Sequence, residues 1–405
     1  MSEEAMISTS RRGLVEGMAG AVLAATLGGI AGRAAAAGPA PQGPVLTPGL
    51  TSAWQEVAGR IAAFADEFEA LAAPRTDIDR AEGFRLFMRY FTIGLDQYVE
   101  YADPAFPAFY QKTRDGVRKF AGDSPGQLYD SAVISPEYEY RVTGDMHDLL
   151  MLEFTVYSGT LNKDNKARRR LVSSLTEAEM KIAPDGRFTV LLNRGGQGEN
   201  ALRMDDDGSV VVVRRYLRDP LRYKPRALTI ERTSGAPVLK PLSTVDLGAQ
   251  LVKAVNFAAW NVKTWAQWVD RCRKTKFNRL AHFDDGGDIY TPAGHKYLEG
   301  YWSVKPGQAL FISFVPPRGR YWSFVPMNYW MESFEWRFGN RVFASSVETS
   351  PGPDGRVRLA LAHADPGRPD TRWIETMGHN EGQMAFRLAR HEGALPDVQC
   401  ELVTL

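Results

Sequence analysis

Residues 353–362, with the sequence PDGRVRLALA, carry the pattern that decides the fold class. The Pro-Asp-Gly segment is typical of a tight hairpin turn, and the apolar run after it is typical of a buried strand. The same kind of pattern occurs in the first half of the chain, where residues 184–192 read PDGRFTVLL. A hairpin of this type in each half indicates that antiparallel β-structure is present in both halves.

Further apolar, β-branched or aromatic runs predict additional strands around these hairpins. They are Tyr138–Val142, Leu149–Tyr157, Val210–Val213, Ala309–Val315, Tyr321–Val325, Arg341–Val347, Met384–Leu388 and Val398–Val403. Glu153 is the exception in the otherwise apolar run 149–157. In the run 321–325, alternation puts Trp322 and Phe324 on one face of the strand and Tyr321 and Ser323 on the other.

Three segments have helical periodicity. The segment from Thr51 to Leu71 has one apolar stripe that includes Trp54, and the segment from Asp77 to Tyr101 is apolar on more than one face. The segment from Val245 to Arg273 carries a stripe that we expect to pack against a sheet: Leu251, Val255, Ala258, Val262, Trp265 and Val269. The predicted fold is therefore α+β and β-rich, with antiparallel β-sandwich units and N-terminal and central helices.

Residues 1–37 resemble a twin-arginine signal peptide. The stretch Ser10–Val15, SRRGLV, matches the serine, paired arginines and apolar residues of that signal, and an apolar stretch follows to Gly32. The small residues at 34–37 suit cleavage near Ala36 or Ala37. We therefore expect the twin-arginine translocase as a partner and a periplasmic or secreted location. We expect no stable membrane anchor, because the apolar stretch is short and rich in Gly and Ala; a retained anchor is the alternative.

Composition and length limit the remaining organisation. The 405 residues suggest a flexible linker at 38–50, a helical and β-domain at 51–243, and a central helix with a β-sandwich at 244–405. With 49 basic and 48 acidic residues and no basic stripe, a nucleic-acid partner is not expected. Cys272 and Cys400 match no metal spacing, and both two free thiols and one late disulfide remain open.

Several short segments of the sequence resemble the long, exported members of the bacterial family called domain of unknown function 1214. They are Arg320–Phe324, Asp354-Gly355, Ala362–Gly367, Trp373–His379, Tyr101–Pro104, Gly122–Pro125 and Tyr138–Arg141. Arg372 departs from the family pattern, which commonly has Asn before the Trp. The resemblance implies a jelly-roll-like β-fold and carries no agreed activity.

The last third of the chain contains the candidates for catalysis, His363, Asp365, Glu375 and His379. Imidazole and carboxylate groups act as general acids and bases or bind metals. The turn at residues 365–367 separates the two histidines, so the spacing does not fit a compact metal motif; no metal ligand is assigned and the cofactor stays unknown. We expect both histidines to share a pocket with Asp365 or Glu375. Alternatively, His363 bonds to backbone and Asp365 caps its turn.

Aromatic and polar residues of the same region are candidates for ligand binding: Tyr321, Trp322, Asn328, Trp330, Arg337 and Trp373. Core packing explains many of these rings, but aromatic walls with a few polar groups also form pockets for small molecules. Arg337 suits a carboxylate or an oxyanion. A polar loop that contains His282, Asp284, Asp285, Asp288 and His295 folds over such a site or lies on the surface.

These residues support three hypotheses about function. The first is an exported enzyme, a hydrolase or lyase, that acts by acid–base chemistry on a small apolar or cyclic molecule. The second is a non-catalytic periplasmic protein that binds a small molecule or a carbohydrate. The third is a structural protein of the cell envelope whose aromatic residues only form a core. A cavity lined by both ionisable groups and rings would favour the first hypothesis.

Overall fold

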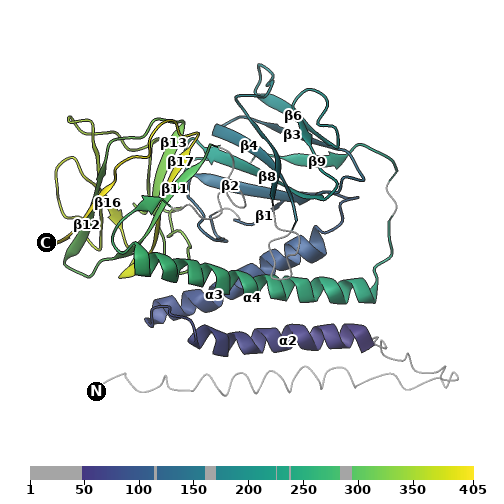
Figure 1. Cartoon of the computed structure of the whole chain (residues 1–405), viewed down its shortest axis with the longest axis horizontal. Helices are drawn as coiled ribbons and strands as arrows, with labels where there is room; N and C mark the ends of the chain where they lie inside the picture. The colour runs from purple at the N-terminus through teal and green to yellow at the C-terminus, as the bar shows by residue number, and fades with distance from the viewer. Residues whose placement is uncertain (1–47, 114–115, 160–169, 225, 237–238, 283–293) are drawn as a thin grey trace, which may run out of the picture. The chain divides into compact units, whose positions relative to one another are not determined.

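The structure, a computed structural model, describes residues 48–405 except 114–115, 160–169, 225, 237–238 and 283–293 (Figure 1). The predicted signal peptide with its cleavage site, most of the linker, and Asp284, Asp285 and Asp288 lie outside the described residues. Among the residues described, no helix combines the length and the apolar composition that a membrane span requires. The predicted α+β, β-rich fold is confirmed.

The helices are α2 (Pro48–Glu69), α3 (Asp77–Leu95), the π-helical turn η1 (Asp96–Glu100) and α4 (Thr244–Thr275). Thr76 and Ser243 cap α3 and α4 by accepting hydrogen bonds from backbone amides three residues later. Helix α4, which carries the predicted stripe, packs on α2 and α3 as well as on strand β11 (Figure 1). A sheet therefore buries only part of this helix, and the other two helices bury the rest. Trp54 on α2 is 64 % exposed and does not join the core as its place in the stripe suggests.

The first half of the chain forms a β-sandwich. Sheet I has the order β1 (Tyr110–Gln111), β2 (Gln127–Val133), β8 (Gly208–Leu217), β4 (Leu149–Ser158), β5 (Arg170–Thr176). Sheet II has the order β7 (Ala201–Arg203), β6 (Arg187–Asn193), β3 (Tyr140–Asp145), β9 (Thr229–Arg232). Their shared core contains Phe154 and Val156 of sheet I and Val142 and Val190 of sheet II.

The second half repeats this arrangement with two more sheets. Sheet III has the order β10 (Ala281–His282), β11 (Lys296–Ser303), β17 (Glu381–Ala389), β13 (Tyr321–Pro326), β14 (Ala344–Ser345). Sheet IV has the order β16 (Arg372–Glu375), β15 (Val357–Ala362), β12 (Gln308–Phe314), β18 (Gln399–Thr404). Phe314 packs between the sheets, with its ring centroid 5.0 Å from Trp322 and 4.7 Å from Phe386.

Two details of the strands differ from the sequence prediction. The predicted strand 341–347 is reduced to the two-residue β14. The edge pairs β6–β7 and β15–β16 are parallel, whereas the other strand pairs are antiparallel. The described residues form one compact unit, and the domain boundary at 243/244 stays a prediction. Both cysteines are free thiols, Cys272 buried in α4 and Cys400 half-buried in β18.

Candidate functional site

Strand alternation gives sheets I and III one apolar and one polar face. In sheet I, Arg214 of β8 lies in register with Tyr129 of β2 on one side and with Glu153 of β4 on the other. In sheet III, Arg387 of β17 lies in register with Tyr297 of β11 and Ser323 of β13. Each polar face therefore contains an arginine flanked by hydroxyl or carboxyl side chains.

The two polar faces meet where sheets I and III lie side by side (Figure 1). The ring centroids of Tyr216 in β8 and Tyr321 in β13 are 5.5 Å apart, in an edge-on arrangement. The hydroxyl of Tyr216 is 2.7 Å from Nε2 of His295, just before β11. We call this place the inter-sheet polar site and define it by Tyr129, Glu153, Arg214, Tyr297, Tyr321 and Arg387.

The two arginines of this site are buried without a carboxylate partner. Arg214, 7 % exposed, donates to the hydroxyls of Thr155 at 3.0 Å and Tyr157 at 2.9 Å. Arg387, 5 % exposed, donates to the backbone carbonyls of Gly122 and Asp123. Within the described part of the chain, neither guanidinium lies within 4.0 Å of a carboxylate oxygen, although buried arginines are normally paired with anions.

Several buried polar atoms on the same two faces have no hydrogen-bond partner among the described residues: Arg387 Nη1, Ser131 Oγ and Glu153 Oε2. Buried polar groups are normally hydrogen-bonded, so these unbonded donors and acceptors make this place the candidate site for a polar ligand. Tyr129 and Tyr297 remain half-buried there, and the phenol of each lies in the electrostatic field of both arginines.

Glu153 gives this site an ionisable group that titrates near neutrality. Burial of the carboxyl group raises its pKa to about 7, although the charge of Arg214 opposes the shift. Its Oε2 atom is 3.6 Å from Nε2 of His295, which in turn is hydrogen-bonded to the Tyr216 hydroxyl. Burial likewise raises the pKa of Tyr321 to about 12, so this phenol is a neutral hydrogen-bond donor at physiological pH. The site can therefore bind an anion and transfer a proton.

The structure separates the predicted ligand-binding residues into different environments. Tyr321 lies in the inter-sheet polar site, whereas Trp322, the next residue, points into the core against Phe314 and Phe386. This is the alternation that the sequence predicts for β13. Arg337 is exposed and forms an ion pair with Glu335 at 2.5 Å, so its guanidinium is already neutralised at the surface.

His379, Asn328 and Trp330 lie together at a second place, beside α3. Nε2 of His379 is 2.9 Å from Oε2 of Glu82, and Asn328 donates to the same oxygen at 2.7 Å. The indole of Trp330 donates to the backbone carbonyl of Asp79 at 2.8 Å. Burial alone would raise the pKa of Glu82, but the hydrogen bond and charge of His379 outweigh it and lower that pKa. We call Asp79, Glu82, Asn328 and His379 the α3 cluster.

The other predicted catalytic residues have local partners instead. Nε2 of His363 is 3.1 Å from the carbonyl of Val304, and the exposed Asp365 accepts from the amide of Gly367 at 2.9 Å. Both contacts agree with the alternative in which His363 bonds to the backbone and Asp365 caps its turn. Trp373 donates from its indole to the carbonyl of Ala362 at 2.9 Å. Glu375 is bonded through its backbone amide to Arg341 at 2.7 Å. Among the residues described, no hydrogen bond or ion pair joins His363, Asp365 or Glu375 to His379.

Sequence reasoning missed most of the inter-sheet polar site. Glu153 had a signal, because it is the charged exception in an apolar strand. No feature of the sequence singles out Arg214. Arg215 beside it has the same side chain, and only the register of the strand decides which face of the sheet each arginine joins. Arg387 also lies within a predicted strand, and its partners come from the other half of the chain. His295 was assigned only to a polar loop.

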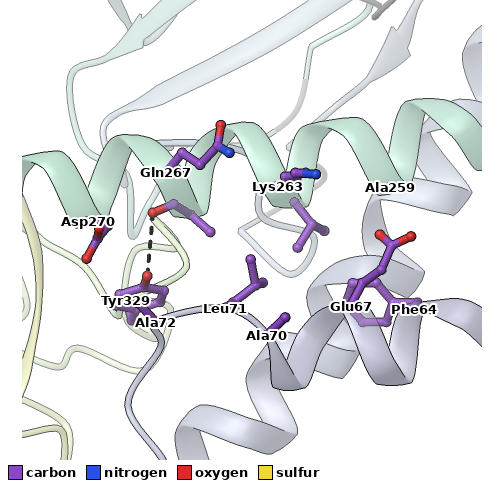
Figure 2. Close-up of a pocket in the computed structure, with 12 residues that line it drawn as sticks. Phe64, Glu67, Ala70, Leu71, Ala72, Ala259, Lys263, Gln267, Asp270 and Tyr329 are labelled. Carbon is purple, nitrogen blue, oxygen red and sulfur yellow. Dashed lines mark hydrogen bonds between the residues drawn. The ribbon is translucent and has the colours of Figure 1, made fainter.

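A cleft of about 300 Å³ lies between α2, α4 and Tyr329, as Figure 2 shows. Apolar side chains such as Phe64 and Leu71 line it, and its polar groups, including Glu67 and Lys263, belong to the two helices. The Tyr329 hydroxyl donates to the carbonyl of Ala266 at 3.4 Å. In the part of the chain that the structure describes, none of the buried unbonded polar atoms belongs to a residue that lines this cleft, so we do not assign the functional site to it.

The fold and the site together define a class: an α+β protein of two β-sandwiches, with helices packed on it and a polar site between sheets I and III. Residues 310–391 match the model of the family described as protein of unknown function (DUF1214).

A crystal structure of an uncharacterized protein from Burkholderia cenocepacia is similar, with a TM-score of 0.81 and 27 % identity over 88 % of this chain and 98 % of that chain. The VPA0106 protein from Vibrio parahaemolyticus matches with a TM-score of 0.43 and 11 % identity, over 78 % of this chain and 96 % of that one. No curated protein matches the sequence. The similarity to the Burkholderia cenocepacia structure covers both β-sandwiches, whereas the family model matches only residues 310–391.

Proposed function

We propose that this protein binds a small cyclic organic anion at the inter-sheet polar site and acts on it as a hydrolase or lyase by acid–base chemistry. The observation that carries the proposal is the pair of buried arginines, Arg214 and Arg387, neither of which has a carboxylate partner in the described chain. A carboxylate of the ligand would supply the missing charge, and guanidinium groups bind carboxylates with high geometric specificity. The half-buried rings of Tyr129 and Tyr297 suit a cyclic ligand.

In this proposal Glu153 is the general acid or base. A carboxyl group with a pKa of about 7 is populated in both protonation states at neutral pH, which is the condition for efficient proton transfer. His295 and Tyr216 form the second proton-transfer pair, because their 2.7 Å hydrogen bond adjoins the carboxyl group. The hydroxyls of Tyr321 and Ser323 orient the ligand by donating hydrogen bonds.

Binding of matched probes tests the proposal. We expect 4-hydroxybenzoate to raise the melting temperature, and the neutral 4-hydroxybenzyl alcohol to have little effect. Arg387→Gln should weaken 4-hydroxybenzoate binding at least ~10-fold in calorimetric titration, because a charge-assisted hydrogen bond is lost. Arg337→Gln, at the exposed surface, is the matched control and should bind like the wild type. A carboxylate panel without any binding, or equal affinity in Arg387→Gln, would contradict the proposal.

The non-catalytic binding protein is the second candidate, since most groups of the site are fixed hydrogen-bond donors rather than proton carriers. The two candidates differ in the fate of the ligand. A binding protein returns every bound carboxylate unchanged, whereas an enzyme converts at least one member of the panel and loses turnover in Glu153→Gln. The structural-protein hypothesis predicts no specific binding at all.

Export by the twin-arginine route is also part of the proposal, supported by SRRGLV at residues 10–15 and the small residues at 34–37. Replacing Arg11 and Arg12 together by Lys should leave the precursor in the cytoplasm, as fractionation and immunoblotting of both compartments would show. Continued export of the double variant would count against this route and against a periplasmic location reached by it.

A further inference from the structure

We propose that Asp79, Glu82 and His379 of the α3 cluster bind one divalent transition-metal ion, at a site separate from the inter-sheet polar site. One ligand atom of each residue lies within 4.8 Å of the others. Asp79 and Glu82 are three residues apart on α3 and so share one face of that helix. The turn between β16 and β17 supplies the imidazole, with Met377 and Gly378 in the left-handed region at φ of 51° and 81°.

The hydrogen-bond geometry of His379 requires a proton or a metal ion beside its Nε2 atom. Its Nδ1 atom is 3.2 Å from the carbonyl oxygen of Thr376, which can only accept, so Nδ1 carries a hydrogen. Its Nε2 atom is 2.9 Å from a carboxylate oxygen of Glu82, which is also an acceptor. Either a proton, on the ring or on the carboxyl group, or a metal ion must lie between them. Adjacent ligand atoms around one ion bound at about 2.1 Å are about 3.0 Å apart in octahedral and about 3.4 Å apart in tetrahedral geometry, so the separation is close to the octahedral value.

Asp79 provides an independent observation in favour of the metal ion. Its carboxylate is 4 % exposed, and one oxygen, Oδ1, has no hydrogen-bond partner among the described residues. The other oxygen accepts the Thr76 hydroxyl in the cap of α3. A proton on His379 would satisfy Glu82 alone and leave this buried oxygen unbonded, at a substantial cost in free energy. A metal ion would be shared by both carboxylates.

The surroundings of the α3 cluster resemble the outer shell of metal sites. A metal-binding histidine usually donates its other ring N–H to a carbonyl, as His379 does to Thr376, and its carboxylate partners are themselves hydrogen-bonded. Asn328 holds Glu82 through its amide, and its own Oδ1 accepts from the backbone amides of Trp330 and Glu332. The ring of Phe334 stacks on the imidazole at 4.9 Å. This shell fixes the ligands before any ion binds.

The donor set selects the chemical class of ion. Two carboxylate oxygens and one imidazole nitrogen suit zinc, manganese or iron(II), whereas calcium and magnesium prefer oxygen ligands alone. Two carboxylates with a neutral imidazole carry two negative charges, and Arg85 offsets part of the charge of Glu82. Arg85 and Arg89 are not metal ligands. Both form ion pairs with Glu332, and Arg85 also pairs with Glu82 at 3.1 Å.

Zinc binding by the purified protein, stripped of metal with a chelator, tests the inference. We expect one zinc ion per chain in equilibrium titration, a higher melting temperature with zinc, and reversal of that increase by the chelator. His379→Gln and Glu82→Gln should each weaken zinc binding at least ~10-fold. His363→Gln is the matched control, because this histidine faces the backbone carbonyl of Val304, and it should bind zinc like the wild type.

Absence of stoichiometric zinc binding by the wild type, or unchanged affinity in His379→Gln, would overturn the inference and leave His379 as a protonated partner of Glu82. If the variants do not fold, anomalous diffraction from zinc-soaked crystals of the wild type decides the question. A peak among Asp79, Glu82 and His379 supports the site, and a peak only at other residues overturns it. These outcomes do not depend on ligand binding at the inter-sheet polar site.

Discussion

At the scale of single residues, two adjacent arginines have opposite environments. Arg215 is paired with Asp130 at 2.8 and 2.9 Å on the apolar face of sheet I. Arg214, on the other face, donates hydrogen bonds to two hydroxyls and lies over the rings of Tyr129 and Tyr157. A buried ion pair that loses one partner leaves an uncompensated charge. The ion pair with Asp130 therefore explains the burial of Arg215, whereas the proposed ligand would supply the partner that Arg214 lacks.

Matched substitutions separate these two roles. Arg215→Gln should lower the free energy of unfolding by about 3–5 kcal/mol, because Asp130 loses its buried partner. Arg214→Gln should cost clearly less, because no carboxylate is left unpaired, and should weaken binding of the carboxylate probe. Urea denaturation of both variants without ligand measures the difference. Equal destabilisation by the two substitutions would mean that Arg214 is also a structural residue.

The raised pKa of Glu153 predicts how stability depends on pH. The native carboxyl group, with a pKa of about 7 against 4.5 for the free side chain, binds its proton more tightly than the unfolded chain does. This contribution to stability is therefore complete below about pH 4.5 and is lost as pH rises to about 7, by up to roughly 3 kcal/mol. Glu153→Gln should lack this loss in urea denaturation at a series of pH values. A constant difference between variant and wild type over that range would contradict the burial of the charge.

At the scale of secondary-structure elements, α4 connects the two sandwiches and packs on α2, α3 and β11. Its position Val262 is 1 % exposed, whereas Val245 in the first turn is 72 % exposed. Val262→Asp should destabilise the protein by roughly 3 kcal/mol or more, because a charge is buried without a partner. Val245→Asp should be close to neutral in the same thermal or urea denaturation. A near-neutral result for Val262→Asp would mean that the stripe is not buried.

Elements could be predicted from the sequence where one periodicity decides them. The hairpins before β6 and β15, the extent of α4 and the alternation in β13 follow from local patterns. Arg341–Val347 shows the limit, because an apolar run does not specify whether a neighbouring strand is available for pairing, and only Ala344 and Ser345 pair. Trp54 shows the same limit for helices. An apolar stripe predicts which face of a helix is buried, but not how much of that face other elements cover, and Trp54 stays exposed.

At the scale of the whole molecule, the inter-sheet polar site is formed by residues from both halves of the chain. Arg214 and Arg387 are far apart in sequence, and only the contact between sheets I and III brings their faces together. Sequence analysis could find catalytic residue types but not this pairing, because no local pattern encodes which sheet faces meet. The same reason explains why His379 was predicted beside His363 and is found beside Glu82 of α3.

The most direct test of the central claim is a crystal structure of the protein grown with 4-hydroxybenzoate. We predict density for the probe between sheets I and III, with its carboxylate bonded to Arg387 or Arg214 and its ring beside Tyr129 or Tyr297. Density for the probe only elsewhere, for example in the cleft beside Tyr329, would contradict the assignment of this site. So would a structure in which carboxylates of the protein itself neutralise both arginines.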